Sequence, residues 1–265
     1  MRISSEKFMI DSPFSLDAIF DDHTHILQHR RGYRFSVDAL LLSWFVFQSL
    51  PRNANRALDL GAGSGVASIL LARRGFGGRI DCVEREPSLF SLLEHNIARN
   101  DLASHLFPIY GDLRTLPLPA EHYDIVFFNP PFFPCPSCRL DKKSERVIAR
   151  HELFGNLHDF LQCGAKALKK KGALCFVHPA TRIVYACSAV VSAGLTITNI
   201  AMMSEYPSHP PSLCLYRCSH GAAHATHTKI SYIFMHTSSG SISTIGQSIL
   251  YADYSKVERN LKKGS

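Results

Sequence analysis

Apolar positions recur with two different periods along the middle of this chain. Short apolar runs typical of buried strands lie between segments that follow the helical period of 3.6 residues. The predicted strands are RALDL (56–60), RIDCVE (79–84), HLFPIY (105–110), YDIVFF (123–128) and ALCFVHP (173–179). The predicted helices are Ser64–Arg74, Pro87–Asn100 and Glu152–Lys169. Strands that alternate with helices connect through right-handed crossovers, so this part predicts a parallel sheet.

The two ends of the chain follow other patterns. Before residue 56, the strongly apolar stretch Val37 to Leu50 predicts one buried helix. After Gly194 come three strand-like runs without a long helix, LTITNIAMM (195–203), LCLYRC (213–218) and TKISYIFMH (228–236). A strand pair there would extend the sheet with an antiparallel edge. The Ser/Gly-rich stretch 238–248 and the tail KVERNLKKGS are predicted to be loop and frayed terminus.

Composition narrows the class of protein. With 265 residues, 46% hydrophobic and 19% charged, the chain is typical of a soluble globular protein. It has no apolar run of 18 residues and no secretory signal, so we expect no membrane span and a cytoplasmic location. The eight cysteines are scattered, unlike a disulfide framework. A net charge of +7 favours a polyanionic partner such as nucleic acid, although a merely basic surface would give the same number.

The strongest local motif is ALDLGAGSG (57–65), in which an apolar strand runs into a glycine-rich turn and then a helix. Gly61, Gly63 and Gly65 allow a tight turn and close approach of a ligand, because no Cβ intrudes. The spacing differs from the dinucleotide fingerprint G-x-G-x-x-G. Asp59 before the turn would repel a pyrophosphate but suits the ammonium and sulfonium of S-adenosylmethionine. The motif therefore favours S-adenosylmethionine over a dinucleotide or a purely structural turn, with Ala62 in the binding segment.

Two further acids follow predicted strands. Glu84 ends the second strand, where it can accept hydrogen bonds from both ribose hydroxyls, and Asp112 after the third can accept from an adenine amino group. Leu113 would pack beside the adenine ring. Each acid alone would be read as a solvated loop residue. At the carboxyl ends of neighbouring strands, however, they lie where open α/β sheets bind their ligands.

The tetrapeptide Asn129-Pro130-Pro131-Phe132 follows the apolar strand YDIVFF. Two prolines cannot continue a strand ladder, so the simplest interpretation is a rigid turn. The same turn also offers the Asn129 side-chain oxygen and the Pro130 carbonyl as acceptors for one planar NH₂ group. Those acceptors would point the nitrogen lone pair at a methyl donor, while Phe132 stacks on the base. No strong general base is then required.

These motifs, in this order, resemble the class I methyltransferases that act on amino groups of adenine, cytosine, guanine or glutamine. The segments GYRFSVDALLLSWFV (32–46), RVIARHE (146–152) and HPATR (178–182) look like the bacterial valine-tRNA adenine-N6 methyltransferases. The resemblance implies an α/β, Rossmann-like, mostly parallel seven-stranded sheet with an antiparallel C-terminal strand and helices on both faces. It also implies that the segment of Phe35 and Asp38 closes over the methionine end of the cofactor.

The patterns along the chain predict three parts. Residues 1–55 would form an arm and helix that pack on the core, 56–236 the catalytic domain that binds S-adenosylmethionine, and 237–265 a C-terminal extension with a basic tail. The activity implied by the resemblance is methylation of adenine N6 in RNA, most readily tRNA. Alternatives are an rRNA or DNA amino-methyltransferase, a protein-glutamine methyltransferase of release factors, and a silent RNA-binding module. Only about 55 residues precede Asp59, which argues against the separate helical substrate domain expected of the glutamine enzymes.

Basic side chains suggest where RNA would lie. A cluster follows the NPPF turn directly, so a phosphate backbone held near the target base would pass it. Its members are Arg139, Lys142, Lys143, Arg146 and Arg150. A second cluster, His29, Arg30, Arg31 and Arg34, lies on the arm, whereas Lys169, Lys170 and Lys171 are read as the cationic end of a helix.

Metal binding is not expected. Cys135 and Cys138 lack a second Cys-x-x-Cys. In the stretch from Cys214 to His227, Cys214 lies in a strand-like apolar run and the histidines lie in a Gly/Ala/Thr-rich segment, so a solvated loop is favoured there over a zinc cluster. S-adenosylmethionine is the one cofactor expected, RNA is the expected partner, and a monomeric state is favoured.

Overall fold

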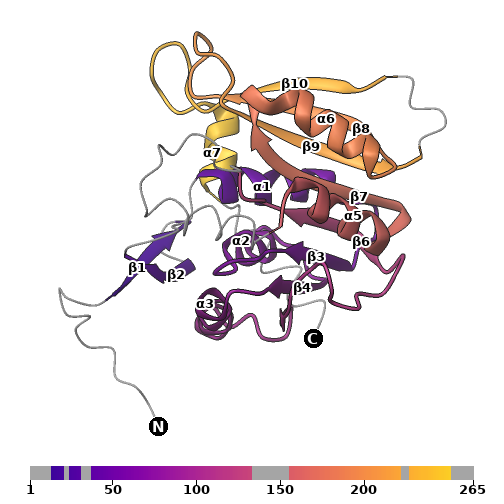
Figure 1. Ribbon diagram of the computed structural model, residues 1–265. Coiled ribbons are helices and arrows are strands. Elements are labelled where there is room, and N and C mark those ends of the chain that lie inside the picture. Colours follow the sequence, from indigo (N-terminus) through magenta and orange to yellow (C-terminus); the bar gives the residue numbers. More distant parts are fainter. Residues whose placement is uncertain (1–12, 21–23, 31–36, 133–154, 222–226, 252–265) are drawn as a thin grey trace, which may run out of the picture.

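A central twisted sheet organises the computed structural model, which describes residues 13–20, 24–30, 37–132, 155–221 and 227–251. Eight strands form it in the order β10-β8-β9-β7-β6-β3-β4-β5, and a separate hairpin of β1 and β2 lies beside α3 (Figure 1). All neighbouring pairs are parallel except the two that β9 makes, with β7 and with β8. The prediction of a mostly parallel α/β sheet is therefore confirmed.

The strands of the parallel region coincide closely with the apolar runs of the sequence. Three of them, β3, β4 and β6, have the predicted bounds, because each run is buried on both faces of the sheet. The sheet strands are β3 (Arg56–Leu60), β4 (Arg79–Glu84), β5 (Leu106–Tyr110), β6 (Tyr123–Phe128), β7 (Leu168–Pro179), β8 (Leu195–Ser204), β9 (Leu213–His220) and β10 (Lys229–Phe234).

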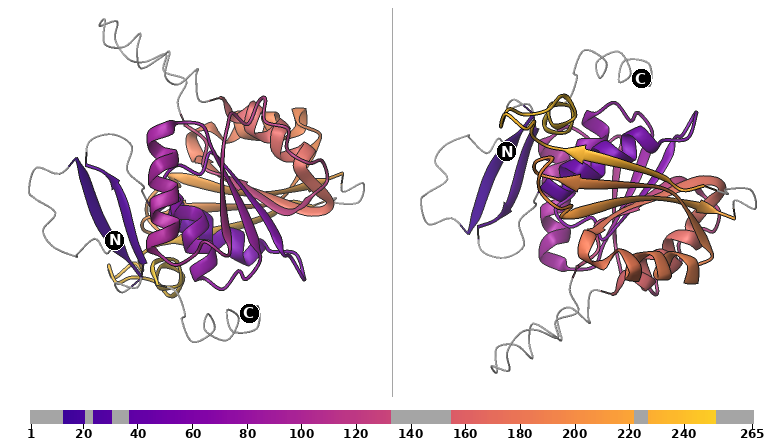
Figure 2. Two further views of the ribbon diagram at one scale, coloured as in Figure 1. Left: turned by 90° about the horizontal axis from the view of Figure 1, so that it is seen from below. Right: turned by 90° about the horizontal axis from the view of Figure 1, so that it is seen from above.

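Helices cover both faces of this sheet (Figure 2). On β6, Ile125 and Phe127 face one hydrophobic core, which includes residues of α1, α2, α3 and α7, while Val126 and Phe128 face the other, which includes residues of α5 and α6. The helices are α1 (Val37–Ser49), α2 (Val66–Arg73), α3 (Pro87–Arg99), α5 (Leu157–Ala167), α6 (Ile183–Ser192) and α7 (Thr244–Leu250), with a 3-10 turn η1 (Ala180–Arg182) before α6. None of the helices described could cross a membrane.

The C-terminal third departs from the prediction. The sheet has eight strands rather than seven, and its antiparallel strand β9 lies inside the sheet rather than at the edge. The edge strand is β10, which pairs with β8 in parallel. Within the stretch predicted as loop, α7 forms, begun by the Ser243 side chain accepting from Gly246 N. The helix α6 was not predicted, because its β-branched apolar sequence IVYACSAVVS lacks an amphipathic period.

One predicted helix also ends earlier than expected. The helix α5 ends at Ala167. Lys169, Lys170 and Lys171 therefore lie near the start of strand β7 and not in the last turn of a helix. Lys169 Nζ lies 2.7 Å from Asp124 Oδ1 on the neighbouring strand β6, so the cation pairs across the sheet. The interpretation of these lysines as complements of a helix dipole is therefore wrong.

The hairpin of β1 (Phe14–Ile19) and β2 (Thr24–His29) is held to α3 by two asparagine side chains. Asn96 accepts from Leu27 N at 2.7 Å and donates to Leu27 O at 2.9 Å, and Asn100 makes the same pair of bonds with His25. The two amides, four residues apart on one helix face, thus replace a neighbouring strand for β2. The Asn96 amide also donates to Ser64 O at 2.9 Å, which ties the hairpin to the glycine-rich turn.

Candidate active site

The turns that follow β3, β4 and β6 meet at one edge of the sheet. Strand β3 lies between the other two, with Asp59 opposite Cys82 on β4 and opposite Phe127 on β6. All three strands are parallel, so Asn129, the glycine-rich turn and Glu84 follow one another in that order along the carboxyl edge. This is the edge at which open α/β sheets bind ligands.

The glycine-rich turn has a backbone that only glycine adopts readily. The φ angles are +68° at Gly61, +59° at Gly63 and +86° at Gly65. A Cβ at Gly65 would come within 2.5 Å of a Leu93 methyl, so that glycine is needed for packing. A Cβ at Gly63 would meet nothing within 4 Å. The turn therefore leaves open space above Gly63, as a closely approaching ligand requires.

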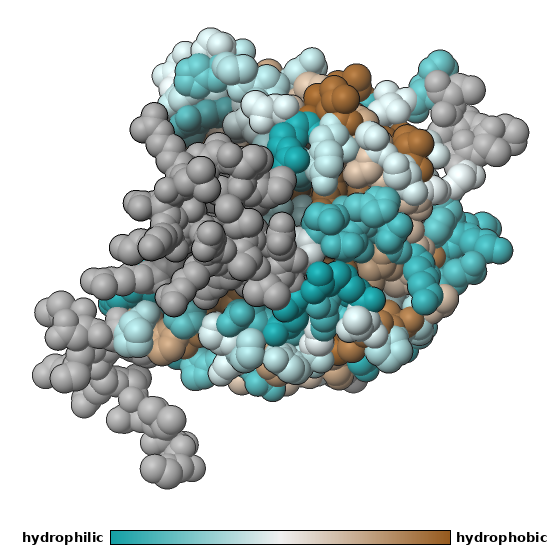
Figure 3. Space-filling model, viewed as in Figure 1, coloured by the Kyte–Doolittle hydropathy of each residue, from teal (hydrophilic) through white to brown (hydrophobic). Residues whose placement is uncertain are grey.

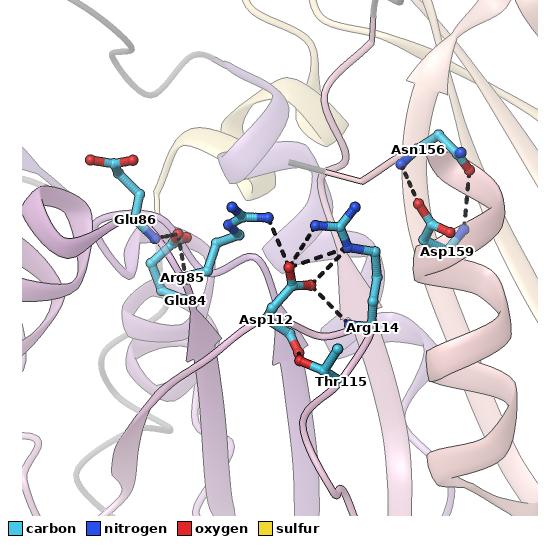
Figure 4. A network of polar contacts seen from close by, with 8 residues as sticks. All are labelled: Glu84, Arg85, Glu86, Asp112, Arg114, Thr115, Asn156 and Asp159. Carbon is cyan, nitrogen blue, oxygen red and sulfur yellow. Dashed lines mark hydrogen bonds and ion pairs between the residues drawn. The ribbon is translucent and has the colours of Figure 1, made fainter. Parts of the chain in front are cut away.

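Glu84, at the end of the neighbouring strand, stabilises this turn and also binds the backbone of the two residues that follow it (Figure 4). Its Oε2 accepts from Gly63 N at 2.8 Å, and its Oε1 accepts from Arg85 N and Glu86 N. The side chain is buried, and burial raises its pKa, while the three backbone N–H groups lower it. A carboxylate has about four acceptor positions and three are used here, so Oε2 keeps capacity for one hydroxyl.

Asp112 lies in a different electrostatic setting. Arg114 donates to both of its oxygens, and Arg85 Nη1 donates to Oδ2 at 2.8 Å (Figure 4). These cations, with the Arg114 hydrogen bond as the largest contribution, lower the pKa of Asp112. One carboxylate thus holds two guanidinium groups, and an adenine amino group would have to share these oxygens with them. Leu113, beside Asp112, is buried in the core.

Asp59 binds helix α2 through its side chain. Its Oδ2 accepts from Ser68 Oγ at 2.6 Å, and the carboxyl is 2% exposed. Burial raises its pKa to about 7, against the Ser68 hydrogen bond and with a smaller contribution from the charge of Glu84. Contact of Asp59 with a cationic cofactor group stays a prediction. Along the edge, Ala62 closes the turn by donating its N–H to Val83 O at 2.9 Å.

The NPPF turn leaves β6 between the two cores. Pro130 is buried, while Asn129, Pro131 and Phe132 are half-buried. Arg182 Nη1 donates to the carbonyl of Phe132 at 2.6 Å. The Phe132 ring meets the ring of His178 edge-on, with centroids 5.8 Å apart. The turn is therefore held at its backbone and at its ring by the segment that ends β7.

His178 is the most unusual titratable group of this region. It is 1% exposed, and its Nδ1 has no hydrogen-bond partner among the described residues. Burial, reinforced by the charge of Arg182, lowers its pKa to about 4. The imidazole is therefore neutral at pH 7. His178 and Arg182 both belong to HPATR, but their contacts with Phe132 span 46 and 50 positions, and the sequence carried no signal for them.

For the remaining predicted site residues, the structure gives the position of Asp38 only. Asp38 lies half-buried in the first turn of α1. Phe35 falls outside the described residues, as do Arg139, Lys142, Lys143, Arg146 and Arg150, and the RNA face predicted from them stays a prediction.

The cysteine- and histidine-containing stretch is partly strand. Cys214 and Cys218 are buried in β9, and His220 contacts the carbonyl of Leu168. Cys214 and Cys218 lie in the strand predicted for residues 213–218, while the expectation of a solvated loop is wrong for His220, because β9 extends to that residue. Within the described ranges, no three Cys, His, Asp or Glu side chains are grouped as a metal site would need.

A parallel sheet, a glycine-rich turn and a buried acid on the next strand define the Rossmann-like class of nucleotide-cofactor enzymes. The methyltransferase small domain family matches residues 38–185, more than half of the chain. The chain belongs to this family.

Comparison with individual proteins gives the same class. The chain is 32% identical over 157 residues to the tRNA1(Val) (adenine(37)-N6)-methyltransferase of Tolumonas auensis, which covers 58% of the chain and 63% of that relative. It is 33% identical over 159 residues to the Yersinia pestis protein of the same name, with 58% and 61% covered. The chain thus spans less than two thirds of these relatives.

Solved structures share the fold. A predicted O-methyltransferase of Agrobacterium tumefaciens superposes with a TM-score of 0.60 at 19% identity, covering 81% of this chain and 97% of that one. The expectation of a class I methyltransferase that uses S-adenosylmethionine is confirmed at the level of the family. The residues also fit this cofactor, because open space above Gly63 adjoins a buried carboxylate that has room for a hydroxyl.

Proposed function

We propose that this protein methylates the exocyclic N6 amino group of an adenine in RNA, most readily in a tRNA. One observation carries the proposal. Asp59 and Phe127 are register partners on parallel strands, so the cofactor turn and the NPPF turn begin at the same level of the sheet edge. A group bound by the first turn and a base bound by the second would therefore be neighbours. The names of the relatives in Tolumonas and Yersinia support the choice of adenine and tRNA.

The chain's residues would divide the work. S-adenosylmethionine supplies a methyl group on a positively charged sulfur. Glu84 would accept from a ribose hydroxyl, and the glycine-rich turn would let the cofactor lie against the backbone. Asn129 Oδ1 and the Pro130 carbonyl would accept the two hydrogens of the target amino group and so direct its lone pair along the line of transfer. Orientation of this kind removes about 7–11 kcal/mol from a bimolecular barrier.

The proton of the amino group needs no strong base in this arrangement. His178 is neutral and buried, and its pKa of about 4 makes it a weak acceptor. The nitrogen becomes acidic once it carries the methyl group and can release its proton to water. Catalysis would then rest on position, with Phe132 holding the base by stacking.

The proposal is tested by methylation of total RNA and total protein from a strain that lacks the gene. Purified protein and labelled S-adenosylmethionine are added, and nucleosides and amino acids are separated after digestion. N6-methyladenosine is the expected labelled product, and label should concentrate in the tRNA fraction. Label in methylglutamine with none in nucleosides would overturn the proposal in favour of a protein substrate. Label in a cytosine or guanine derivative would overturn the choice of base.

A further inference from the structure

An exposed aromatic side chain lies close to the candidate target-base turn, at the start of α6. Tyr185 is 39% exposed, and Val184 beside it is 81% exposed. The view of Figure 3 shows apolar surface above α5, where α6 runs in Figure 1. Val191, further along the same helix, is 71% exposed, so α6 carries three of the exposed large apolar side chains of the described residues.

Arg182 joins this tyrosine to the target-base turn. Its guanidinium carbon lies 4.4 Å from the centre of the Tyr185 ring. The same guanidinium donates to the Phe132 carbonyl at 2.6 Å. One side chain thus fixes both aromatic residues, and it places a positive charge against the face of the tyrosine.

His178 forms a second link between the same two rings. Its ring centre lies 5.8 Å from that of Phe132 and 5.9 Å from that of Tyr185. The histidine is almost fully buried, so its ring is held in place and contacts both aromatic rings. Phe132 and Tyr185 are therefore held in one arrangement from behind by His178 and bridged by Arg182.

From this arrangement we propose that Tyr185 and Arg182 form a second base-binding surface, for a nucleotide next to the target adenine. This inference rests on the function proposed above. Single-stranded RNA is recognised by stacking of unpaired bases on aromatic rings and guanidinium planes. An adenine stacked on Phe132 leaves its chain neighbour close by, and Tyr185 together with the guanidinium that lies on its ring offers that neighbour a flat surface. The guanidinium adds attraction for the phosphate between the two nucleotides.

The surface differs from the predicted basic cluster in what it recognises. Phosphate contacts from lysine and arginine give salt-dependent affinity for any RNA. A tyrosine ring binds only an unstacked base, so it selects loops and single strands over duplex. Tyr185 would thus help the enzyme choose a target in a loop, where both the target base and its neighbour can leave their stacks.

Kinetics with Tyr185 variants test the proposal, with tRNA from a strain lacking the gene as the methyl acceptor. Tyr185→Ala should raise the KM for tRNA about tenfold, because stacking on an aromatic residue is lost. Tyr185→Phe keeps the ring and should restore the KM. Tyr232→Ala is the matched control, since Tyr232 is 56% exposed but lies on the distant edge strand β10. Affinity for S-adenosylmethionine and the single-turnover rate at saturating tRNA should be unchanged in all three.

The outcomes separate this inference from the function on which it rests. If the unmodified protein transfers no label to RNA, the proposed function fails, and the second base-binding surface fails with it. If it methylates tRNA and Tyr185→Ala leaves the KM unchanged, only the surface is wrong. A raised KM that Tyr185→Phe does not restore, or that Tyr232→Ala reproduces, also contradicts it. A lower single-turnover rate with normal KM would place Tyr185 in the chemical step, and this too overturns the proposal.

Discussion

The two halves of the carboxyl edge are built from different interactions. In the cofactor half, made by the turns after β3, β4 and β5, carboxylates bind backbone N–H groups and arginines, as Glu84 and Asp112 do. In the base half, made by the NPPF turn and the end of β7, rings pack on rings and one guanidinium fixes a carbonyl. Each half is complementary to its proposed ligand, since one ligand carries hydroxyls and charges and the other is a flat neutral base. Carboxylates thus dominate the cofactor half, whereas the base half combines aromatic contacts with a single guanidinium, that of Arg182.

The largest effect is expected from a substitution in the base half. Asn129→Ala should lower the single-turnover rate by about 10²–10³-fold at saturating tRNA and cofactor, because the amino group loses an acceptor that orients it. The affinity for S-adenosylmethionine should be nearly unchanged when measured by calorimetry. Asn129→Asp keeps an acceptor oxygen and should lose less. A near-normal single-turnover rate in Asn129→Ala would show that the NPPF turn does not orient the reacting group.

A smaller effect should follow from breaking the cofactor half. Glu84→Ala should weaken S-adenosylmethionine binding by roughly 1–3 kcal/mol, the usual loss for charge-assisted hydrogen bonds. Turnover at saturating cofactor should change little, which reverses the pattern of Asn129→Ala. The neighbour Glu86, half-buried on the same turn, is the matched control, and Glu86→Ala should bind normally. Equal cofactor affinity in both variants would show that Glu84 serves only the glycine-rich turn.

The sequence predicted the cofactor half better than the base half, for a physical reason. Strands β3 and β4 are short apolar runs that end in turn residues, so local composition fixes their bounds. Positive φ at Gly61 and Gly63 is also a local demand that selects glycine. The partners of Phe132 are 46 and 50 residues away, and nothing in NPPF specifies which side chains will hold it.

Other differences have the same cause. The hairpin β1–β2 is held by Asn96 and Asn100, which lie about 70 residues further along the chain, so no local sequence pattern predicts that contact. Asp112 binds Arg85 across 27 positions and Arg114 across 2, so only the second pair is close in the sequence. Asp59 was assigned to the cofactor from its motif alone, whereas the alternation of the strand places it on the face of Ala57, where it binds Ser68 of α2.

The smallest expected effect concerns the pH dependence of stability, because burial shifts the pKa of one side chain upward in the cofactor half and of another downward in the base half. Asp59 in the cofactor half has its pKa raised to about 7 by burial, so the folded protein keeps a proton that the unfolded chain loses near pH 4. The stability that Asp59 contributes is present below pH 4 and is lost as the pH rises to about 7. His178 in the base half has its pKa lowered to about 4. As the pH falls, the unfolded chain therefore binds a proton near pH 6.5, whereas the folded protein binds it only near pH 4. Its contribution is present above pH 6.5 and is lost as the pH falls toward 4.

Urea unfolding of Asp59→Asn and His178→Gln between pH 4 and 8 measures this contrast. The free energy of unfolding of each variant is compared with that of the unchanged protein, because other groups titrate equally in both. Relative to it, Asp59→Asn should gain stability as the pH rises from 4 to 7, and His178→Gln should gain stability as the pH falls from 6.5 to 4. Each slope is bounded at about 1.4 kcal/mol per pH unit, the value for one proton. Curves parallel to that of the unchanged protein would mean that the replaced side chain titrates alike in the folded and unfolded states. For His178→Gln, this outcome would contradict the neutral buried imidazole beside Phe132.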